Sequence, residues 1–254
     1  MTREGLDHRL AAERPLWFDV DGETLLGILH PACADARVGV VVVVGGPQYR
    51  VGSHRQFVLL ARDVAAAGYP VLRFDYRGMG DSSGAARDFE AIEPDVDAAI
   101  AVLKAETGVE RVVLWGLCDA ASAALIHARR STPADALILL NPWVHTEQGE
   151  ARVRLKTYYL RRLLSRDLWH KIVRLEFDVS GSLRSLLGYV RQIRGRGAGD
   201  DGPAHYVDRM LDGLRGFNGP LYVILSGDDL TASEFRELIA GSRAWREAWQ
   251  ACCR

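Results

Sequence analysis

Residues 111–125 read RVVLWGLCDAASAAL, and this stretch decides the fold. Its first part, Arg111–Trp115, is apolar and rich in β-branched residues, as expected of a buried strand. Its last part is a run of small residues that continues a helical pattern to Arg130. The short link forces a sharp turn, and the strand and the helix can approach each other there only because the side chains are small. The stretch therefore predicts a strand–turn–helix unit with Cys118 at the turn.

The alternation of strands and helices extends to both sides of this unit. A β-hairpin is expected first, with strands at 17–20 and 24–30 joined by an Asp21-Gly22 turn that tolerates positive φ. The pattern then contains strands at 38–44, 70–74, 136–140 and 220–225, and helices at 56–67, 95–106 and 233–253. Strands and helices that alternate at these lengths predict an α/β protein with a doubly wound, mostly parallel sheet.

Residues 144–219 interrupt the alternation. The segment has a helical pattern in YYLRRLLSRDLWHKIVRLEF and an excess of basic residues, whereas the rest of the chain has an excess of acidic ones. We expect a core at 1–143, a helical lid insertion at 144–219 and the second part of the core at 220–254. The lid residues expected to contact an anionic substrate are Arg161, Arg162 and His145. A solvated amphipathic surface explains the same charges.

The composition is that of an ordinary globular protein and excludes several classes of function. Lys and Arg number 32 against 33 Asp and Glu, a balance that does not suit a nucleic-acid partner. No apolar run has the length of a membrane span, and the charged N-terminus lacks a secretory signal pattern, so we expect a cytoplasmic protein. The four cysteines do not form a disulfide framework. No spacing of His, Cys and Asp indicates a metal site, and we expect no cofactor.

The turn at Cys118 resembles the nucleophile elbow of the α/β-hydrolases, G-x-S-x-G, which projects a nucleophile above the end of a sheet. Two residues differ, because Cys118 replaces the Ser and Ala120 replaces the last Gly. The resemblance implies that Cys118 is the nucleophile, and the N-terminus of the following helix favours its thiolate. The alternative is a buried, unreactive cysteine in an ordinary strand-to-helix turn.

GGPQY, residues 45–49, follows the valine-rich strand, where the resemblance places the loop that donates an N–H to the oxyanion hole. Pro47 has no N–H. Gln48, our preferred donor, or Gly46 would therefore act together with the N–H of Asp119. A turn without a catalytic role is the competing interpretation.

The resemblance also assigns roles to two further strand ends. DYRGMGDSSG, residues 75–84, matches an architectural segment in which Arg77 and Asp81 are expected to pair locally. SGDDL, residues 226–230, matches the position of the triad acid, whose carboxylate would orient a catalytic histidine. Asp229 is our choice for this acid and Asp228 is the second candidate, whereas consecutive aspartates in a turn can also serve only as helix caps.

Three segments are similar to the exosortase A system-associated hydrolase type 1 within this superfamily. They are GLCDAASA (116–123), NPWVHTEQGEARVRLKTYYLRRLLS (141–165) and LSGDDLTASEF (225–235). Those bacterial proteins are similar to the serine aminopeptidase and lysophospholipase branch, and their gene neighbourhood links them to exopolysaccharide production and protein sorting. The resemblance to the α/β-hydrolases covers nearly the whole chain. The closer resemblance of the three segments implies a hydrolase with a helical lid and with a natural substrate that is not established.

One expected residue is absent from the sequence. All seven histidines precede Asp229, whereas the resemblance implies a triad histidine roughly 20 to 30 residues after the acid. We therefore expect the last strand and this histidine to lie beyond residue 254. The leading hypothesis is a hydrolase of esters, thioesters or amides that takes a small or acylated substrate through an acyl-enzyme at Cys118. The alternatives are an acyltransferase and a non-catalytic relative that binds a small molecule or a partner protein.

Overall fold

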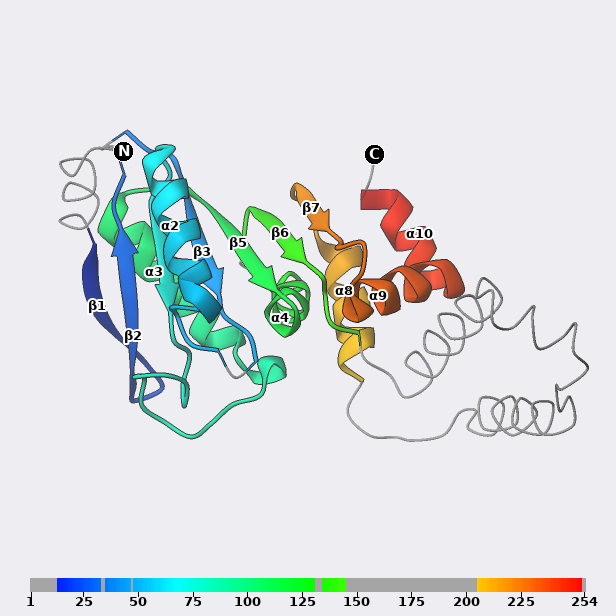
Figure 1. Ribbon diagram of the computed structural model, residues 1–254, viewed down its shortest axis with the longest axis horizontal. Helices are drawn as coiled ribbons and strands as arrows, with labels where there is room; N and C mark the ends of the chain where they lie inside the picture. The colour runs from blue at the N-terminus through cyan, green and yellow to red at the C-terminus, as the bar shows by residue number, and fades with distance from the viewer. Residues whose placement is uncertain (1–12, 33–34, 47, 131–133, 145–204, 253–254) are drawn as a thin grey trace, which may run out of the picture.

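The computed structural model describes residues 13–32, 35–46, 48–130, 134–144 and 205–252. The described residues form one seven-stranded sheet in the order β1-β2-β4-β3-β5-β6-β7 (Figure 1). The strands are β1 (Arg14–Val20), β2 (Glu23–His30), β3 (Val38–Val43), β4 (Val71–Phe74), β5 (Arg111–Leu117), β6 (Ala136–Leu140) and β7 (Leu221–Ile224). β2 pairs antiparallel with β1 and β4, and all other neighbours are parallel. The expected α/β class with a mostly parallel sheet is confirmed.

The hairpin and the central strand follow from their residue types. Asp21 and Gly22 both have positive φ, at 53° and 84°, as a two-residue hairpin turn requires. The side chains of Val41, Val42 and Val43 in β3 are fully buried. Both faces of this strand are covered, which explains why its sequence has no alternation of polar and apolar residues.

Helices cover both faces of the sheet (Figure 1). On one face lies α2 (Gln56–Ala66), whose Phe57 packs edge-on against Trp115 of β5, with ring centroids 5.7 Å apart. On the other face lie α3 (Glu93–Thr107) and α4 (Asp119–His127), which bury Leu103 and Leu125. The three helices were expected within a few residues of these bounds.

α8 (Tyr206–Gly216) packs directly on α4, although its residues lie within the range 144–219 that the sequence assigned to an insertion. Gly213 makes the close approach possible, because a Cβ there would lie 1.7 Å from the backbone oxygen of Leu125. Met210 and Leu214 on the same helix are buried in the main core. Residues 145–204 of the expected insertion lie outside the described residues.

The prediction of a single closing helix at 233–253 is wrong, because the segment forms two helices, α9 (Leu230–Gly241) and α10 (Arg243–Cys252). The backbone is extended at Ser242, with φ −103° and ψ 124°, and this residue separates the two helices. The hydroxyl of Ser242 accepts a hydrogen bond from the N–H of Trp245 at 3.4 Å, as a cap of α10. Trp245 packs edge-on against Phe235 of α9, with ring centroids 5.9 Å apart.

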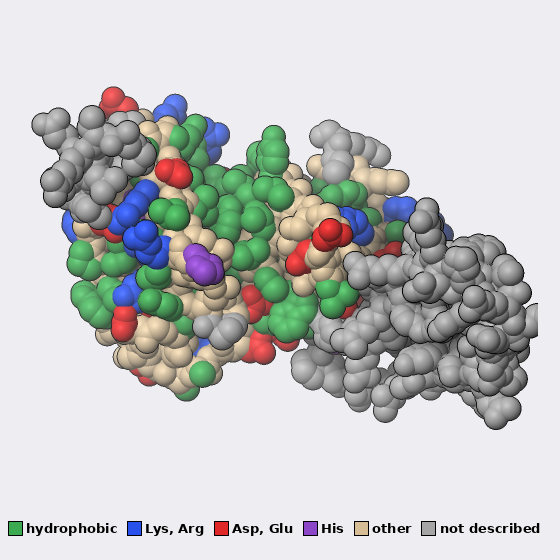
Figure 2. Space-filling view, in the orientation of Figure 1, with side chains coloured by type: hydrophobic (Ala, Val, Ile, Leu, Met, Phe, Trp, Pro, Cys, Tyr) green, Lys and Arg blue, Asp and Glu red, His purple; other side chains and the backbone are tan. Residues whose placement is uncertain are grey.

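β7 is an edge strand of the sheet as far as the structure describes the chain. Its side chains Tyr222 and Ile224 are 70% and 52% exposed and point to the same face. Figure 2 shows hydrophobic side chains gathered across the middle of the molecule on the face that it presents. None of the helices in the described ranges has the length and hydropathy needed to cross a membrane.

Candidate active site

Cys118 occupies a strained position between β5 and α4. Its φ of 61° and ψ of −122° lie in a region that residues with a side chain rarely adopt. The strand and the helix touch here, since a Cβ at Gly116 would lie 2.6 Å from the backbone oxygen of Ala120, which is itself fully buried. The small residues on both sides of Cys118 are therefore required by packing, as the sequence predicted.

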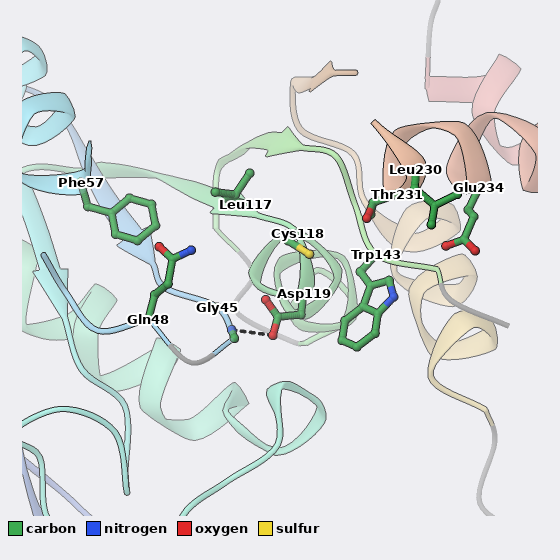
Figure 3. Close-up of a pocket in the computed structure, with 11 residues that line it drawn as sticks. Gly45, Gln48, Phe57, Leu117, Cys118, Asp119, Trp143, Leu230, Thr231 and Glu234 are labelled. Atoms are coloured by element: carbon green, nitrogen blue, oxygen red, sulfur yellow. Dashed lines mark hydrogen bonds between the residues drawn. The ribbon is translucent and has the colours of Figure 1, made fainter. Parts of the chain in front are cut away.

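A cavity of about 410 Å³ opens beside the Cys118 side chain (Figure 3). Most of its lining is apolar and comes from Phe57 of α2, Leu117 of β5, Trp143 after β6 and Leu230 of α9. The polar part of the lining consists of Gly45, Gly46, Gln48, Cys118, Asp119, Thr231 and Glu234. The residues lie on the loops after β3, β5 and β6 and on α2, α4 and α9. They meet because the carboxyl ends of parallel strands lie at one edge of a sheet.

Cys118 is a thiol that does not ionise easily. Burial raises its pKa most, and the negative charges of Asp119 and Asp229 raise it further. The backbone N–H of Asp119 donates to the sulfur and lowers the pKa, but the net shift is upward. The N–H at the helix N-terminus acts in the expected direction, but two carboxylates and the loss of water outweigh it.

The loop after β3 contributes Gly46 and Gln48 to the cavity, as expected. The N–H of Gly46, however, donates to Oδ2 of Asp119 at 2.6 Å and is already satisfied. The side chain of Gln48 is held by Gln56, whose Nε2 donates to its Oε1 at 3.1 Å. The structure thus brings together all three predicted oxyanion residues and adds a contact that the sequence did not indicate, between the Asp119 carboxylate and the Gly46 N–H.

The Asp119 side chain is buried between this loop and α4, with an exposed fraction of 7%. Its Oδ1 accepts from the N–H of Ala120 at 3.0 Å, and burial raises the pKa of the carboxyl. The fit is close, since a Cβ at Gly45 would lie 1.9 Å from Oδ1. Sequence reasoning assigned only the backbone N–H of Asp119, because no pattern shows where a side chain at a tight turn will point.

Asp229 follows β7 and caps α9, where its Oδ1 accepts from the N–H of Ala232 at 2.8 Å. Its charge reaches Cys118, whose pKa it raises, although Asp229 does not line the cavity. Asp228 is exposed on the preceding turn. Asp229 therefore serves as a helix cap, which was the alternative to a triad acid. Its negative charge still acts on the sulfur of Cys118.

Four histidines lie in the described ranges, and none of them lines the cavity. His127 is buried, with Nε2 at 2.7 Å from a carboxylate oxygen of Asp97. His205 caps α8, and His54 is exposed near the start of α2. His145, Arg161 and Arg162, predicted as lid contacts, lie outside the described residues. Within the described part of the chain no group of three His, Cys, Asp or Glu could hold a metal ion.

Sequence reasoning missed Trp143, Thr231 and Glu234, which line the cavity. Trp143 follows the end of β6, so the rule that ligands bind at strand ends could have found it. Glu234 has an exposed fraction of 4% and comes from the second turn of α9. Its sequence context is that of any helical glutamate, and only the packing of α9 beside the turn reveals it.

A second cavity of about 400 Å³ adjoins the first and shares Gly46 and Gln48 with it. It is lined further by Tyr49, Tyr76 and Arg87, and by residues 78–80. Arg87 is exposed and brings a positive charge to this cavity. The two cavities together form a site with an apolar side and a polar side that meet at the loop after β3.

Comparison with known proteins agrees with this geometry. A profile of the serine aminopeptidase family S33 matches residues 35–179. The lysophosphatidylserine lipase ABHD12 of Gallus gallus is 33% identical over 141 residues, which are 54% of this chain and 33% of that protein. Protein ABHD12B of Homo sapiens is 31% identical over 118 residues, 45% of this chain and 32% of that protein. The chain spans about a third of the length of these curated relatives.

Solved structures share the fold. The esterase Pf2001 of Pyrococcus furiosus superposes with a TM-score of 0.60 and 15% identity, covering 93% of this chain and 79% of that one. The α/β-hydrolase GrgF of Penicillium superposes with a TM-score of 0.57 and 19% identity, covering 89% of this chain and 84% of that one. The family match spans more than half of the chain and contains the turn at Cys118. The chain therefore belongs to the serine aminopeptidase family S33, and its fold is that of the α/β-hydrolases.

Proposed function

We propose that this protein hydrolyses an ester, with Cys118 as the nucleophile and an acyl-enzyme as the intermediate. The observation that carries the proposal is the position of Cys118 in a strained turn, in the lining of a mostly apolar cavity and beside the backbone N–H of Asp119. Strain of this kind costs about 1–3 kcal/mol and persists where the surrounding fold enforces it, as at active sites. Thioesters and amides present the same carbonyl group and fall within the same proposal.

The reaction would proceed in two steps. The sulfur of Cys118 attacks the carbonyl carbon while the thiol proton passes to a base. The N–H of Asp119 and an N–H of the loop after β3, from Gln48 or Gly46, stabilise the charge on the carbonyl oxygen. The carbon–oxygen bond then breaks, and the alcohol leaves with the proton. Water next attacks the thioester, which releases the acid and restores the thiol. A histidine oriented by Asp229 is the base in this proposal.

The substrate proposed is the ester of an apolar acyl group and an alcohol that carries an anion. The apolar lining of the first cavity suits the acyl group, and Arg87 in the second suits the anion. A relative that matches over 141 residues supports this choice, since it is named a lysophosphatidylserine lipase. Arg161 and Arg162 in the expected lid would add to the same preference.

The finer family assignment is also a proposal. The segments GLCDAASA and LSGDDLTASEF support membership of the exosortase A system-associated hydrolases, and with it a link to exopolysaccharide production. A cytoplasmic location and a lid at 144–219 belong to the same proposal. Deleting the gene in its host and measuring exopolysaccharide secretion tests it; normal secretion would argue against the link.

An ester assay with matched variants tests the nucleophile. p-Nitrophenyl butyrate should be turned over by the protein, and Cys118→Ala should lose the turnover because no acyl-enzyme can form. Cys252→Ala, which alters another cysteine outside the cavity, is the control and should keep full activity. Mass spectrometry after rapid quenching should detect a butyryl adduct on Cys118.

A non-catalytic relative is the second candidate function, and the raised pKa of Cys118 favours it. Unchanged turnover in Cys118→Ala, or the absence of an adduct, would support that candidate. An acyltransferase would form the same adduct and pass it to an added alcohol acceptor in place of water, so the ratio of ester product to free acid separates the two activities.

A further inference from the structure

The carboxylate of Asp119 binds a backbone N–H that the proposed reaction could use to hold the substrate oxygen. Its Oδ2 lies 2.6 Å from the backbone nitrogen of Gly46 and accepts the hydrogen bond of that N–H. Figure 3 shows the carboxylate beside Cys118 and directed at this loop. The contact joins the residue that follows the proposed nucleophile to the loop whose N–H groups would hold a developing oxyanion.

The loop offers few N–H groups for that purpose. Pro47 has none, so only the neighbours of this residue can donate. One of them, Gly46, donates to the carboxylate in the structure. A charged acceptor makes a stronger hydrogen bond than a neutral carbonyl oxygen, so a substrate competes poorly for this donor while the carboxylate is ionised.

The charges around Asp119 act in the same direction. The groups that face its carboxylate are the thiol of Cys118 on the same turn, Tyr76 after β4 and Asp88 before α3, and none of these carries a positive charge. Glu234 from α9 lines the same cavity, and the described residues of the lining include no Lys, Arg or His. Negative charge that forms on the sulfur or on a carbonyl oxygen is therefore opposed by a fixed carboxylate nearby.

We propose that the ionised carboxylate of Asp119 is a positioning residue that restrains acyl transfer at Cys118, by holding the Gly46 N–H away from the substrate oxygen. This inference rests on the proposed function. Release requires the loss of the negative charge, when a proton from solvent adds to a carboxylate oxygen and weakens the bond to Gly46. The freed N–H then donates to the carbonyl oxygen of the substrate.

Asp119→Asn tests the restraint, because the amide keeps the shape of the side chain and removes the charge. The ester kcat/KM at pH 8 should rise about tenfold, since one oxyanion donor contributes on the order of a hundredfold and the amide still competes weakly for it. The ratio of variant to wild type should shrink as the pH falls and the wild-type carboxyl gains its proton. Asp88→Asn, which removes a nearby charge without touching Gly46, should change kcat/KM less than twofold.

Two readouts do not depend on ester turnover. The rate of Cys118 alkylation by iodoacetamide should rise several-fold in Asp119→Asn at neutral pH, because the thiol ionises more easily. The amide resonance of Gly46 should shift with pH in the wild type and stay constant over the same range in the variant. An unchanged midpoint of thermal unfolding would show that the variant is folded.

The outcomes separate this inference from the proposed function. If Cys118→Ala keeps the ester turnover, the proposed function fails, and the alkylation and resonance data still decide whether Asp119 restrains the thiol and the loop. If Cys118→Ala abolishes turnover but Asp119→Asn is slower than the wild type at every pH, the nucleophile stands. In that case the restraint is overturned, and the carboxylate serves only to hold the loop in place.

Discussion

The guanidinium of Arg77 donates to both carboxylate oxygens of Asp95, at 2.8 and 3.0 Å, and both side chains are buried. The backbone N–H of Arg77 reaches the same carboxylate at 3.1 Å, and a second carboxylate, that of Asp21, lies at 2.6 Å. The pair joins the segment after β4 to α3. A buried ion pair whose polar atoms are satisfied becomes costly to break from one side, because the remaining charge is left without a partner.

Arg77→Met should therefore lower the free energy of unfolding by about 3–5 kcal/mol. The control is Arg37→Met, which removes an exposed pair with Glu110 whose side chains are 71% and 60% accessible. Its effect on the free energy of unfolding should be far smaller, because solvent screens an exposed ion pair. Urea unfolding at pH 7 measures both, and a loss below about 1 kcal/mol for Arg77→Met would contradict the prediction.

Gly213→Ala should destabilise the protein even though alanine favours a helix. The added Cβ would meet the backbone oxygen of Leu125 at 1.7 Å, so α8 would have to move away from α4, at a cost of about 1–3 kcal/mol. Gly216 lies on the same helix with open space around it. Gly216→Ala should stabilise by up to about 1 kcal/mol. Effects of the same sign in thermal unfolding would refute this account of the helix contact.

His30 should make the protein sensitive to mild acid. Its Nε2 accepts from Nε of Arg73 at 2.7 Å, which requires a neutral ring, and burial followed by the charge of Arg73 lowers its pKa to about 4. The unfolded chain takes up the proton near pH 6.5, so stability is fully present above that pH and is lost as the pH falls toward 4. The upper limit of the loss is about 3 kcal/mol.

His30→Gln should flatten the dependence of stability on pH between 6.5 and 4, because an amide oxygen can accept from Arg73 without titrating. The free energy of unfolding, measured by urea at several pH values, gives the slope. His54→Gln replaces an exposed histidine and should leave the slope as in the wild type. An equal slope for His30→Gln and the wild type would show that another group is responsible.

Leu230→Ser should alter the preference for acyl length. Leu230 lines the apolar cavity and is 46% exposed, so the change should not unfold the protein. We expect kcat/KM for p-nitrophenyl octanoate to fall about tenfold, which corresponds to about 1.4 kcal/mol of lost apolar contact, while the acetate ester changes less than twofold. Tyr222 is exposed and lies outside the cavity, so Tyr222→Ser should leave kcat/KM unchanged for both substrates.

Arg87→Gln should raise KM for an ester whose alcohol part carries a phosphate, by about three- to tenfold at low salt, and should leave a neutral ester unchanged. The difference should shrink at 0.5 M salt, because the charge is exposed and therefore screened. Arg243→Gln, at another exposed arginine, is the control. Equal effects on KM for the two esters would show that Arg87 does not bind the phosphate of the substrate.

The parts of the fold that depend only on residues close together in the sequence could be predicted. The hairpin turn at Asp21-Gly22, the buried strand β3 and the turn at Cys118 follow from residue types over a few positions. The partner of Arg77 could not be predicted, since Asp95 lies in a different element and the expected local pairing with Asp81 does not form. Asp81 instead lies 2.6 Å from Arg50.

The same limit applies to the site. Cys118 and the loop at Gly46 could be predicted as site residues because their motifs resemble those of the α/β-hydrolases. The structure brings both to one cavity. The side chain of Asp119 could not, since its direction depends on how closely the loop approaches α4. α8 was also missed as a core helix, because its contact with α4 depends on a missing side chain at Gly213 and leaves no periodic signal.

The strained backbone of Cys118 lowers the stability of the fold, whereas its thiol is what the proposed reaction needs. Glycine adopts positive φ without strain, so Cys118→Gly should relieve the backbone and raise the melting temperature while it removes the only sulfur in the described lining of the cavity. A laboratory selection for thermal tolerance alone would therefore discard this residue early. The same selection combined with a demand for thiol reactivity would have to find its gains elsewhere, for example at Gly216.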